Sequence, residues 1–275
     1  MDKYAIKLKK LKFFVSYITP LSTFFALRNQ KILANTTFLL YDKSMIQALK
    51  TPTNVDELKA EYKSQSLVYY TPLEELFNTI THALGVVFAC VCLILMLLRA
   101  KTPEAVATAV LSCFCIGLEF FISAAYHGTK DISKKKIWRR VDYPAVNLNV
   151  IACGTSLCLL YGHVYGYVAY AISFVLSFGM LFGCLFAFDK FMSWCVGSTF
   201  TIGGLLFAAF FVSYFTGGGI NNQHLVGALY LAGLLTCLVG AIIFKIHRLY
   251  MHSVFHVFVL VGPMLCMLAN YFQLS

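Results

Sequence analysis

Charged side chains are scarce in this chain of 275 residues, and their scarcity excludes whole classes of protein. Asp, Glu, Lys and Arg make up 12% of the residues, whereas 59% are hydrophobic and the mean hydropathy is +0.74. An ordinary soluble domain has about 25% charged residues. The composition therefore argues against a soluble globular enzyme. Because the apolar excess fills most of the length, it also excludes a domain anchored by a single span.

Three long stretches lack charge altogether. No Asp, Glu, Lys or Arg occurs at 143–188, 191–244 or 249–275. Such stretches suit the hydrocarbon core of a bilayer, where a central charge is costly. They do not alternate apolar and polar residues, as the strands of a β-barrel would. We expect an all-α integral membrane protein, a seven-transmembrane helix bundle, with spans near 77–98, 105–126, 144–162, 167–188, 193–215, 225–244 and 253–271.

Cysteine is absent from the predicted loops. All ten cysteines lie in apolar stretches, which argues against a disulfide framework and favours small buried hydrophobic side chains. The pairs Cys90/Cys92 and Cys113/Cys115 cannot each chelate one ion, because positions i and i+2 of a helix point about 200° apart.

The first 65 residues differ from the rest, because they hold half of the 22 basic residues. We expect a basic cytoplasmic or membrane-surface arm at 1–65 and a seven-helix membrane domain at 66–275. The apolar stretch 13–27, which follows four lysines, also resembles the core of a signal peptide. The net charge of +10 could suggest nucleic acid. Because the other basic residues mostly sit in short loops, we expect no nucleic acid and instead anionic lipid headgroups at the arm and the basic loop.

Basic residues gather in the loops on one side of the predicted bundle. The loop after the second span carries six, and later loops on that side add Lys190, Lys245 and Arg248. The opposite side has only Arg99 and Lys101. Cytoplasmic loops are enriched in Lys and Arg, so we expect this side and the N-terminus in the cytoplasm and the C-terminus outside. The expected membrane is a plasma membrane or a bacterial inner membrane.

Polar side chains interrupt the apolar spans in clusters that all fall on the basic side. Each cluster opens or closes a span, and its members recur every four residues: Glu74, Asn78 and His82; Glu119, Ser123 and His127; Asp142 alone; and His252 and His256. Residues four apart share one helix face. Ionisable groups inside a span are candidates for a functional site, and convergence from four helices favours one intramembrane site.

These residue types favour metal binding. His252 and His256 lie on successive turns and form a chelating pair, which His127 can complete. Three protein ligands leave one tetrahedral position open, the arrangement of a catalytic zinc, which activates water and polarises a bound carbonyl. Asp142 could then accept a proton or orient the water, and Ser123 could hydrogen-bond the water or the substrate.

Structural interpretations of these residues compete with metal binding. Two histidines four residues apart also cap helices or bind lipid headgroups. Glu74, Asn78 and His82 stand at a helix start, where acids meet the positive end of the helix dipole. A purely structural role for these three residues therefore stays open.

Several of these residues lie in motifs that resemble those of the hemolysin III family, within the progestin and adipoQ receptor superfamily. The similar segments, spread over about residues 70–275, are EELFNTITHALG at 74–85, SAAYH at 123–127, Asp142 with IACGT at 151–155, and HSVFHVFVL at 252–260. The resemblance implies a seven-helix bundle with zinc near its cytoplasmic face. It also implies that His127, His252 and His256 are the ligands, with Asp142 and Ser123 beside them.

Relatives in that superfamily include adiponectin receptors, with ceramidase activity, and alkaline ceramidases, while bacterial members carry the hemolysin name. This chain departs from many members in having Tyr143 after the third-span Asp and Cys266 late in the seventh span. We predict a zinc-dependent hydrolase that acts on a lipid amide, with a ceramide-like membrane lipid as substrate. A receptor or sensor with structural zinc, a pore-forming cytolysin and a transporter remain alternatives.

Overall fold

The computed structural model describes residues 55–161, 163–215 and 223–274, which are helical and contain no strand, as the all-α prediction requires. The chain divides into two units, Met1–Glu61 and Tyr62–Ser275. Residues 1–54 of the expected arm lie outside the described residues. The described elements are α3 (Val55–Ser64), α4 (Pro72–Arg99), α5 (Pro103–Gly128), α6 (Ile132–Ser156), the π-helical turn η1 (Leu157–Tyr161), α7 (His163–Phe215), α8 (Gln223–Phe244) and α9 (Met251–Phe272).

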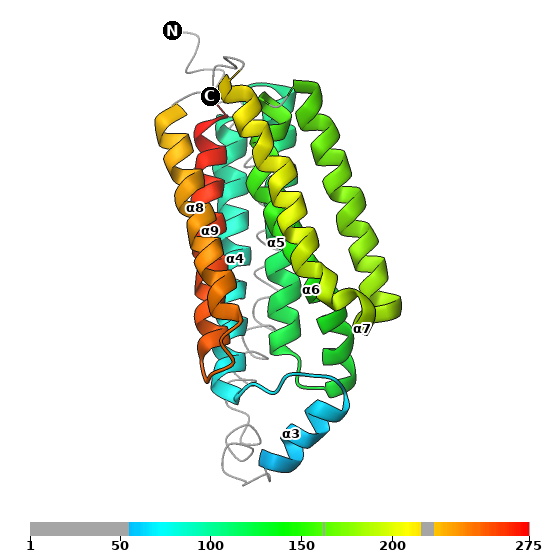
Figure 1. The fold of residues 1–275 in the computed structure, drawn as a ribbon. Helices are drawn as coiled ribbons and strands as arrows, with labels where there is room; N and C mark the ends of the chain where they lie inside the picture. The colour runs from blue at the N-terminus through cyan, green and yellow to red at the C-terminus, as the bar shows by residue number, and fades with distance from the viewer. Residues whose placement is uncertain (1–54, 162, 216–222, 275) are drawn as a thin grey trace, which may run out of the picture. The chain divides into compact units, whose positions relative to one another are not determined.

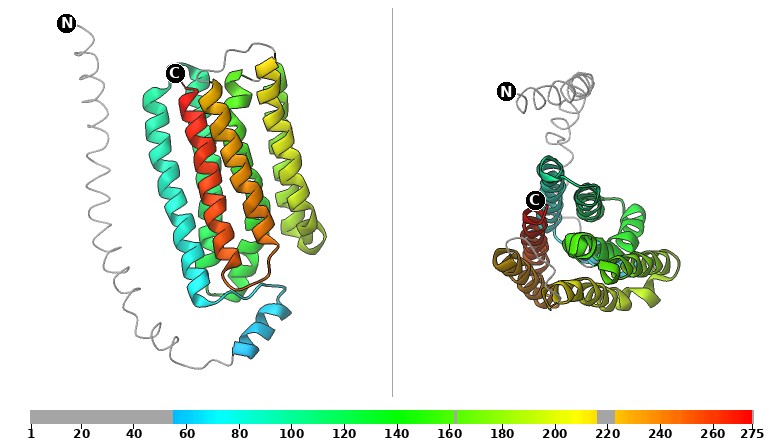
Figure 2. Two further views of the ribbon diagram at one scale, coloured as in Figure 1. Left: turned by 60° about the vertical axis from the view of Figure 1, so that its left-hand side comes forward. Right: turned by 90° about the horizontal axis from the view of Figure 1, so that it is seen from above.

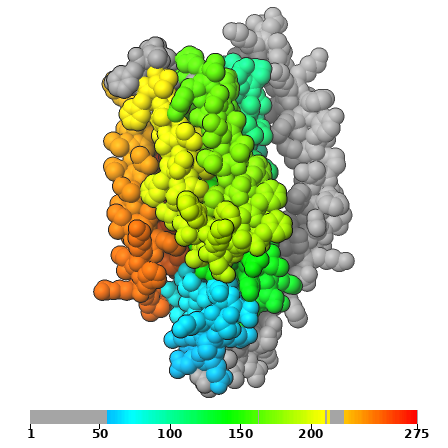
Figure 3. All heavy atoms as spheres, turned by 45° about the vertical axis from the view of Figure 1, so that its right-hand side comes forward, coloured from blue at the N-terminus to red at the C-terminus, as the bar shows by residue number. Residues whose placement is uncertain are grey.

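Six of these helices, α4 to α9, are long and apolar enough to cross a membrane. The 28 residues of α4 extend for about 42 Å at a rise of 1.5 Å per residue, which exceeds the ~30 Å of a bilayer's hydrocarbon core. Large apolar side chains such as Phe186 and Leu98 are exposed, whereas Asn78 and Glu119 are buried. Helix α7 covers much of the face shown in Figure 3, and many of its exposed side chains are apolar. An apolar outside and a polar inside suit lipid surroundings.

Helix α5 packs on α4 and α6, α6 packs on α7, and α9 closes the bundle. It packs on α8 and also on α4 and α6, which are far from it in the sequence (Figure 1). The view along the helices in Figure 2 shows them grouped around a common axis. Because α5 ends where α4 and α9 begin, the polar clusters of these three helices meet at one end of the bundle.

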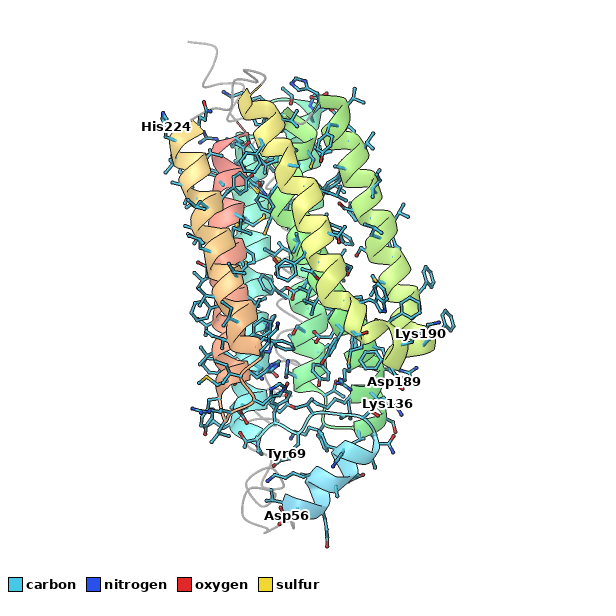
Figure 4. All side chains as sticks on the ribbon, in the orientation of Figure 1. Asp56, Tyr69, Lys136, Asp189, Lys190 and His224 are labelled. Carbon is cyan, nitrogen blue, oxygen red and sulfur yellow. The ribbon has the colours of Figure 1, made fainter. Side chains whose placement is uncertain are left out.

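Helix α7 is broken at Ala187, where the backbone is non-helical with φ −141° and ψ 55°. Its 53 residues would run about 80 Å if straight, more than twice the hydrocarbon thickness. Instead the chain folds back into two arms (Figure 1). Asp189 and Lys190 lie at the turn between the arms (Figure 4). The expected fourth and fifth spans correspond to these arms.

The entry into α4 is tightly capped. Thr71 accepts a hydrogen bond from the Glu74 amide, and the Glu74 carboxylate accepts from the Thr71 amide, which together form a capping box. The second Glu74 oxygen accepts from the Tyr250 amide at 2.7 Å. Tyr250 precedes α9 and has a left-handed φ of 63°, which a bulky residue rarely adopts. Glu74 thereby joins the starts of α4 and α9.

The third membrane helix begins earlier in the sequence than the predicted third span. Helix α6 begins at Ile132, with Asp131 as its cap, and Pro144 lies inside it rather than at its start. The prediction used the start of the apolar stretch as the start of the helix. The preceding basic turns are nevertheless helical, because Lys135 and Arg139 turn inward and are buried against neighbouring backbone and aromatic rings.

Candidate metal centre

Three histidines from two helices meet at one end of the bundle. His127 lies in the last turn of α5, and His252 and His256 lie in the first turns of α9. One ligand nitrogen from each lies within 4.8 Å of the other two. The Nε2 atoms of His252 and His256 are 3.0 Å apart. Helix α4 packs on both α5 and α9, and so holds the three side chains together.

The donor set fits a metal ion. His127 and His256 are each only 3% exposed, and the buried His127 Nε2 has no hydrogen-bond partner. A ligand nitrogen lies about 2.0–2.1 Å from zinc, so two ligand nitrogens of one ion are at most about 4.2 Å apart. The observed limit of 4.8 Å between the nitrogens is close to that separation. Imidazole suits zinc, copper, iron and nickel alike, so the trio by itself does not select the metal.

Glu75 orients His127 from behind. Its Oε2 lies 2.7 Å from His127 Nδ1, and this short contact to a carboxylate places the imidazole proton on Nδ1. The Nε2 lone pair is then free to face the other two histidines. Metal-binding histidines commonly donate their second nitrogen to a carboxylate, which fixes the ring and raises its basicity. Asn78 Nδ2 lies farther from the same nitrogen, at 3.4 Å.

Lys135 completes this arrangement from α6. Its ammonium group, on a side chain only 1% exposed, lies 2.9 Å from Glu75 Oε1. It also donates to the carbonyl oxygens of Tyr126 at 2.9 Å and Thr129 at 3.3 Å. Lys135 therefore neutralises Glu75 and satisfies the last carbonyls of α5, which fixes the helix end that carries His127.

His82 supports His256 in the same way. His82 Nε2 contacts His256 Nδ1, and the two rings meet edge to face with centroids 4.3 Å apart. His256 Nδ1 therefore has a partner in α4, while its Nε2 faces the site. The other nitrogen of His82, Nδ1, is buried without a partner.

Tyr70 covers His252. The two rings stack with centroids 4.4 Å apart and an angle of 18°. Burial, more than the nearby charged groups, raises the pKa of the Tyr70 hydroxyl above its ordinary value, so the hydroxyl stays protonated and able to donate. The segment before α4 thus contributes one wall of the site.

Ser123 and Asp142 lie close together on α5 and α6. Ser123 is buried one turn before His127, and its hydroxyl lies close enough to the half-buried Asp142 to interact with its carboxyl group. Asp142 is also close enough to Tyr70 and Glu75 to interact with them electrostatically. A carboxylate and a hydroxyl therefore accompany the histidines.

The remaining polar candidates divide into two that lie away from the histidine trio, Glu74 and Glu119, and two that contact it, Asn78 and His82. Glu74 uses both carboxylate oxygens in the helix caps described above, which supports its structural interpretation. Glu119 lies eight residues before His127, about 12 Å along α5, and accepts a hydrogen bond from Asn149 at 3.3 Å. The structure therefore brings Asn78 and His82 to the histidine trio, but it places Glu119 deeper in the bundle.

Sequence reasoning missed Glu75, Lys135 and Tyr70 as neighbours of the trio. Glu75 had a usable signal, because it lies seven residues before His82 and so shares its helix face. The four-residue spacing of Glu74, Asn78 and His82 instead favoured Glu74, the acid next to it. Lys135 is one of six basic residues in a segment that was predicted to be a loop, so its sequence provided no separate signal. No local pattern distinguishes Tyr70 from the other tyrosines.

Comparison with known proteins agrees with the motifs. No solved structure matches the chain. The family model for haemolysin-III-related proteins matches residues 70–267, a range that contains α5 and all three histidines. With its six apolar helices and this match over most of its length, the chain is an integral multi-pass membrane protein that belongs to the haemolysin-III-related family.

Proposed function

We propose that this protein is a zinc-dependent hydrolase that cleaves the amide bond of a membrane lipid of the ceramide type. The observation that carries the proposal is the histidine trio. Three nitrogen donors, two buried and one half-buried, converge from two helices, and three protein ligands are the number that leaves a position open for chemistry. Family membership alone decides neither the reaction nor the metal, because one fold hosts many functions.

The side chains around the trio have roles that follow from their contacts. When bound, zinc would supply Lewis-acid activation of water and of the scissile carbonyl. Asp142 accepts the proton that the attacking water loses and delivers it to the leaving amine, so that amide and water become carboxylic acid and amine. Ser123, which lies beside Asp142, helps to position its carboxylate. Tyr70, which stays protonated, is a donor to the substrate.

The hydrolase proposal is tested by turnover and metal content together. Purified full-length protein in detergent is given labelled ceramide with and without a chelator, and fatty-acid release that the chelator abolishes is expected. Asp142→Asn should keep the metal and lose turnover. Glu104→Gln, an exposed carboxylate at the other end of α5, is the control and should keep both.

Each alternative function has its own outcome in that experiment. Bound metal without turnover by wild-type protein would overturn the hydrolase and favour a receptor or sensor with structural zinc. Dye leakage from liposomes that carry the protein, again without turnover, would favour a pore-forming cytolysin.

The proposed topology counts the two arms of α7 as separate spans, which gives seven. The N-terminus and the basic end are then cytoplasmic and the C-terminus is outside, in a plasma or bacterial inner membrane. In a background with the native cysteines replaced, Ser133→Cys should resist an impermeant thiol reagent in intact cells, and Lys101→Cys should react. Both positions are exposed. Ser133 lies in the first turn of α6 and Lys101 between α4 and α5, at opposite ends of the bundle, so the reverse pattern would overturn the orientation.

A further inference from the structure

A small polar cavity lies beside the basic loop, separate from the histidine trio. It measures about 60 Å³, whereas a single water needs roughly 10–15 Å³ of such space. The cavity therefore has room for a group of several heavy atoms. Its lining includes Ser66, Lys136, Arg139, Arg140, Phe188 and Asp189. Figure 4 shows Lys136 and Asp189 at the same end of the bundle, near the turn of α7.

Arg139 is the fixed centre of this cavity. It is only 7% exposed, and its guanidinium group lies over the Phe188 ring at 5.0 Å and the Tyr143 ring at 5.2 Å. One terminal nitrogen donates to the Ser66 carbonyl oxygen, and the other lies 3.4 Å from the Tyr143 hydroxyl. The side chain is therefore held in place before any ligand arrives.

The charge of Arg139 is not neutralised by contact. Its Nε is buried without a hydrogen-bond partner, and no carboxylate of the described residues forms an ion pair with it. Asp142 acts on it electrostatically without such a contact. Burying a cation without a partner is costly, so an anion in the cavity would be strongly favoured.

The neighbouring charges set the kind of anion. Lys136 and Arg140 line the same cavity and are half-buried, and the exposed Asp189 is the one acid among the lining residues. Three cations and one carboxylate leave a net charge of +2. A phosphomonoester carries about −1.5 to −2 at pH 7 and has three strong acceptor oxygens. Arg and Lys are the residues that bind such groups through charge-assisted hydrogen bonds.

We propose that this cavity binds a phosphomonoester group, carried by the headgroup of an anionic phospholipid. The cavity lies at the end of helices that cross a membrane, where lipid headgroups are concentrated. Arg139 and the cavity connect α6, the turn of α7 and the segment at Ser66. The same segment continues to Tyr70, which covers His252, so a bound headgroup would also stabilise that wall of the histidine site.

Lipid retention measured by native mass spectrometry tests this proposal without depending on metal or turnover. Full-length protein is exchanged into detergent with either dioleoyl phosphatidate or phosphatidylcholine, and thermal shifts are recorded with inorganic phosphate. Wild-type protein should retain phosphatidate in preference to phosphatidylcholine. Lys136→Gln with Arg140→Gln should reduce that retention about tenfold or more. The partly exposed pair is chosen because loss of buried Arg139 could prevent folding.

The matched control is Lys130→Gln with Lys134→Gln. It removes the same charge from the basic segment 130–140 at positions outside the cavity, and should change retention by no more than about twofold. Asp189→Asn should increase phosphatidate retention, because it removes the one opposing charge. If phosphatidate is retained no better than phosphatidylcholine but inorganic phosphate stabilises wild-type protein and not the cavity variant, the phosphate site stands and its lipid source is overturned. Equal losses in the cavity and control variants, or no response to any phosphate, would overturn the site itself.

Discussion

The two ends of α9 carry two buried polar clusters that differ in how completely their atoms are paired. At its start, His252 and His256 face His127, and nitrogen atoms of His127 and His82 have no hydrogen-bond partner. At its end, Asn270 belongs to a network that pairs nearly every polar atom. The first cluster consists of ionisable histidines, of which His252 is half-buried, whereas the second consists of buried amides and hydroxyls.

The far network joins α6, α8 and the end of α9, and of its side-chain polar atoms Gln273 Oε1 is left without a hydrogen-bond partner. The Gln273 amide donates to Ser156 at 2.9 Å and to Tyr230 at 2.8 Å. Both hydroxyls in turn donate to the Asn270 carbonyl oxygen at 2.6 Å. The Asn270 amide donates to the Ala152 carbonyl oxygen at 2.9 Å. In lipid, such a network holds helices together because no water competes for its members.

The contrast separates a structural role from a binding role. A satisfied network gains nothing from a ligand, whereas a buried donor or acceptor without a partner costs free energy until a ligand supplies one. We therefore expect substitutions in the first cluster to change metal binding and substitutions in the second to change stability alone.

The largest effect is expected for His256→Ala. Loss of one of three ligands should reduce the metal content of purified protein to background, because two histidines alone hold an ion weakly. Metal analysis after purification without chelator measures this. His224→Ala, exposed at the start of α8 (Figure 4), should keep the wild-type content. Full metal content in His256→Ala would contradict the site.

Asn270→Ala should be next in size, and it acts on stability. It removes the carbonyl oxygen to which the Ser156 and Tyr230 hydroxyls donate and the amide that donates to the Ala152 carbonyl oxygen, which should lower the free energy of unfolding by about 2–4 kcal/mol. Metal per folded chain should not change. Thermal unfolding in detergent measures the first quantity, with Thr236→Ala, at a half-buried position of α8 outside this network, as control. A loss of metal comparable with that of His256→Ala would remove the distinction between the two clusters.

Glu75→Gln should have the smallest of the three effects. Loss of the carboxylate behind His127 should weaken metal affinity about 10- to 100-fold, or about 1.4–2.8 kcal/mol. It also strands the buried Lys135 cation, which destabilises the fold. Combining it with Lys135→Met should restore much of the stability without restoring metal affinity. Affinity is measured by titration of metal-free protein, and wild-type affinity in Glu75→Gln would show that His127 needs no such support.

Local sequence patterns predicted much of this molecule because membrane insertion is a local constraint. A charge-free stretch in lipid must satisfy its backbone within itself, so it forms a helix whatever its neighbours are. The pair His252 and His256 is likewise local, since four residues return a helix to the same face. The positions of the helix ends were harder to predict from the sequence, as the early start of α6 shows. In the sequence, a basic turn resembles a loop. Only the contacts of Lys135 and Arg139 with other parts of the chain show why it is helical.

The sequence by itself determined that the chain forms membrane helices and that their polar residues gather at one end, because both follow from composition and helical periodicity. Only the tertiary structure decided that Glu75 rather than Glu74 supports His127, because adjacent residues point about 100° apart and the packing of α4 on α5 selects between them. It likewise decided that Tyr70 covers His252, and that Ser156, Tyr230, Asn270 and Gln273 form one network. Those contacts join segments far apart in the chain, and their partners are defined only when the helices are packed.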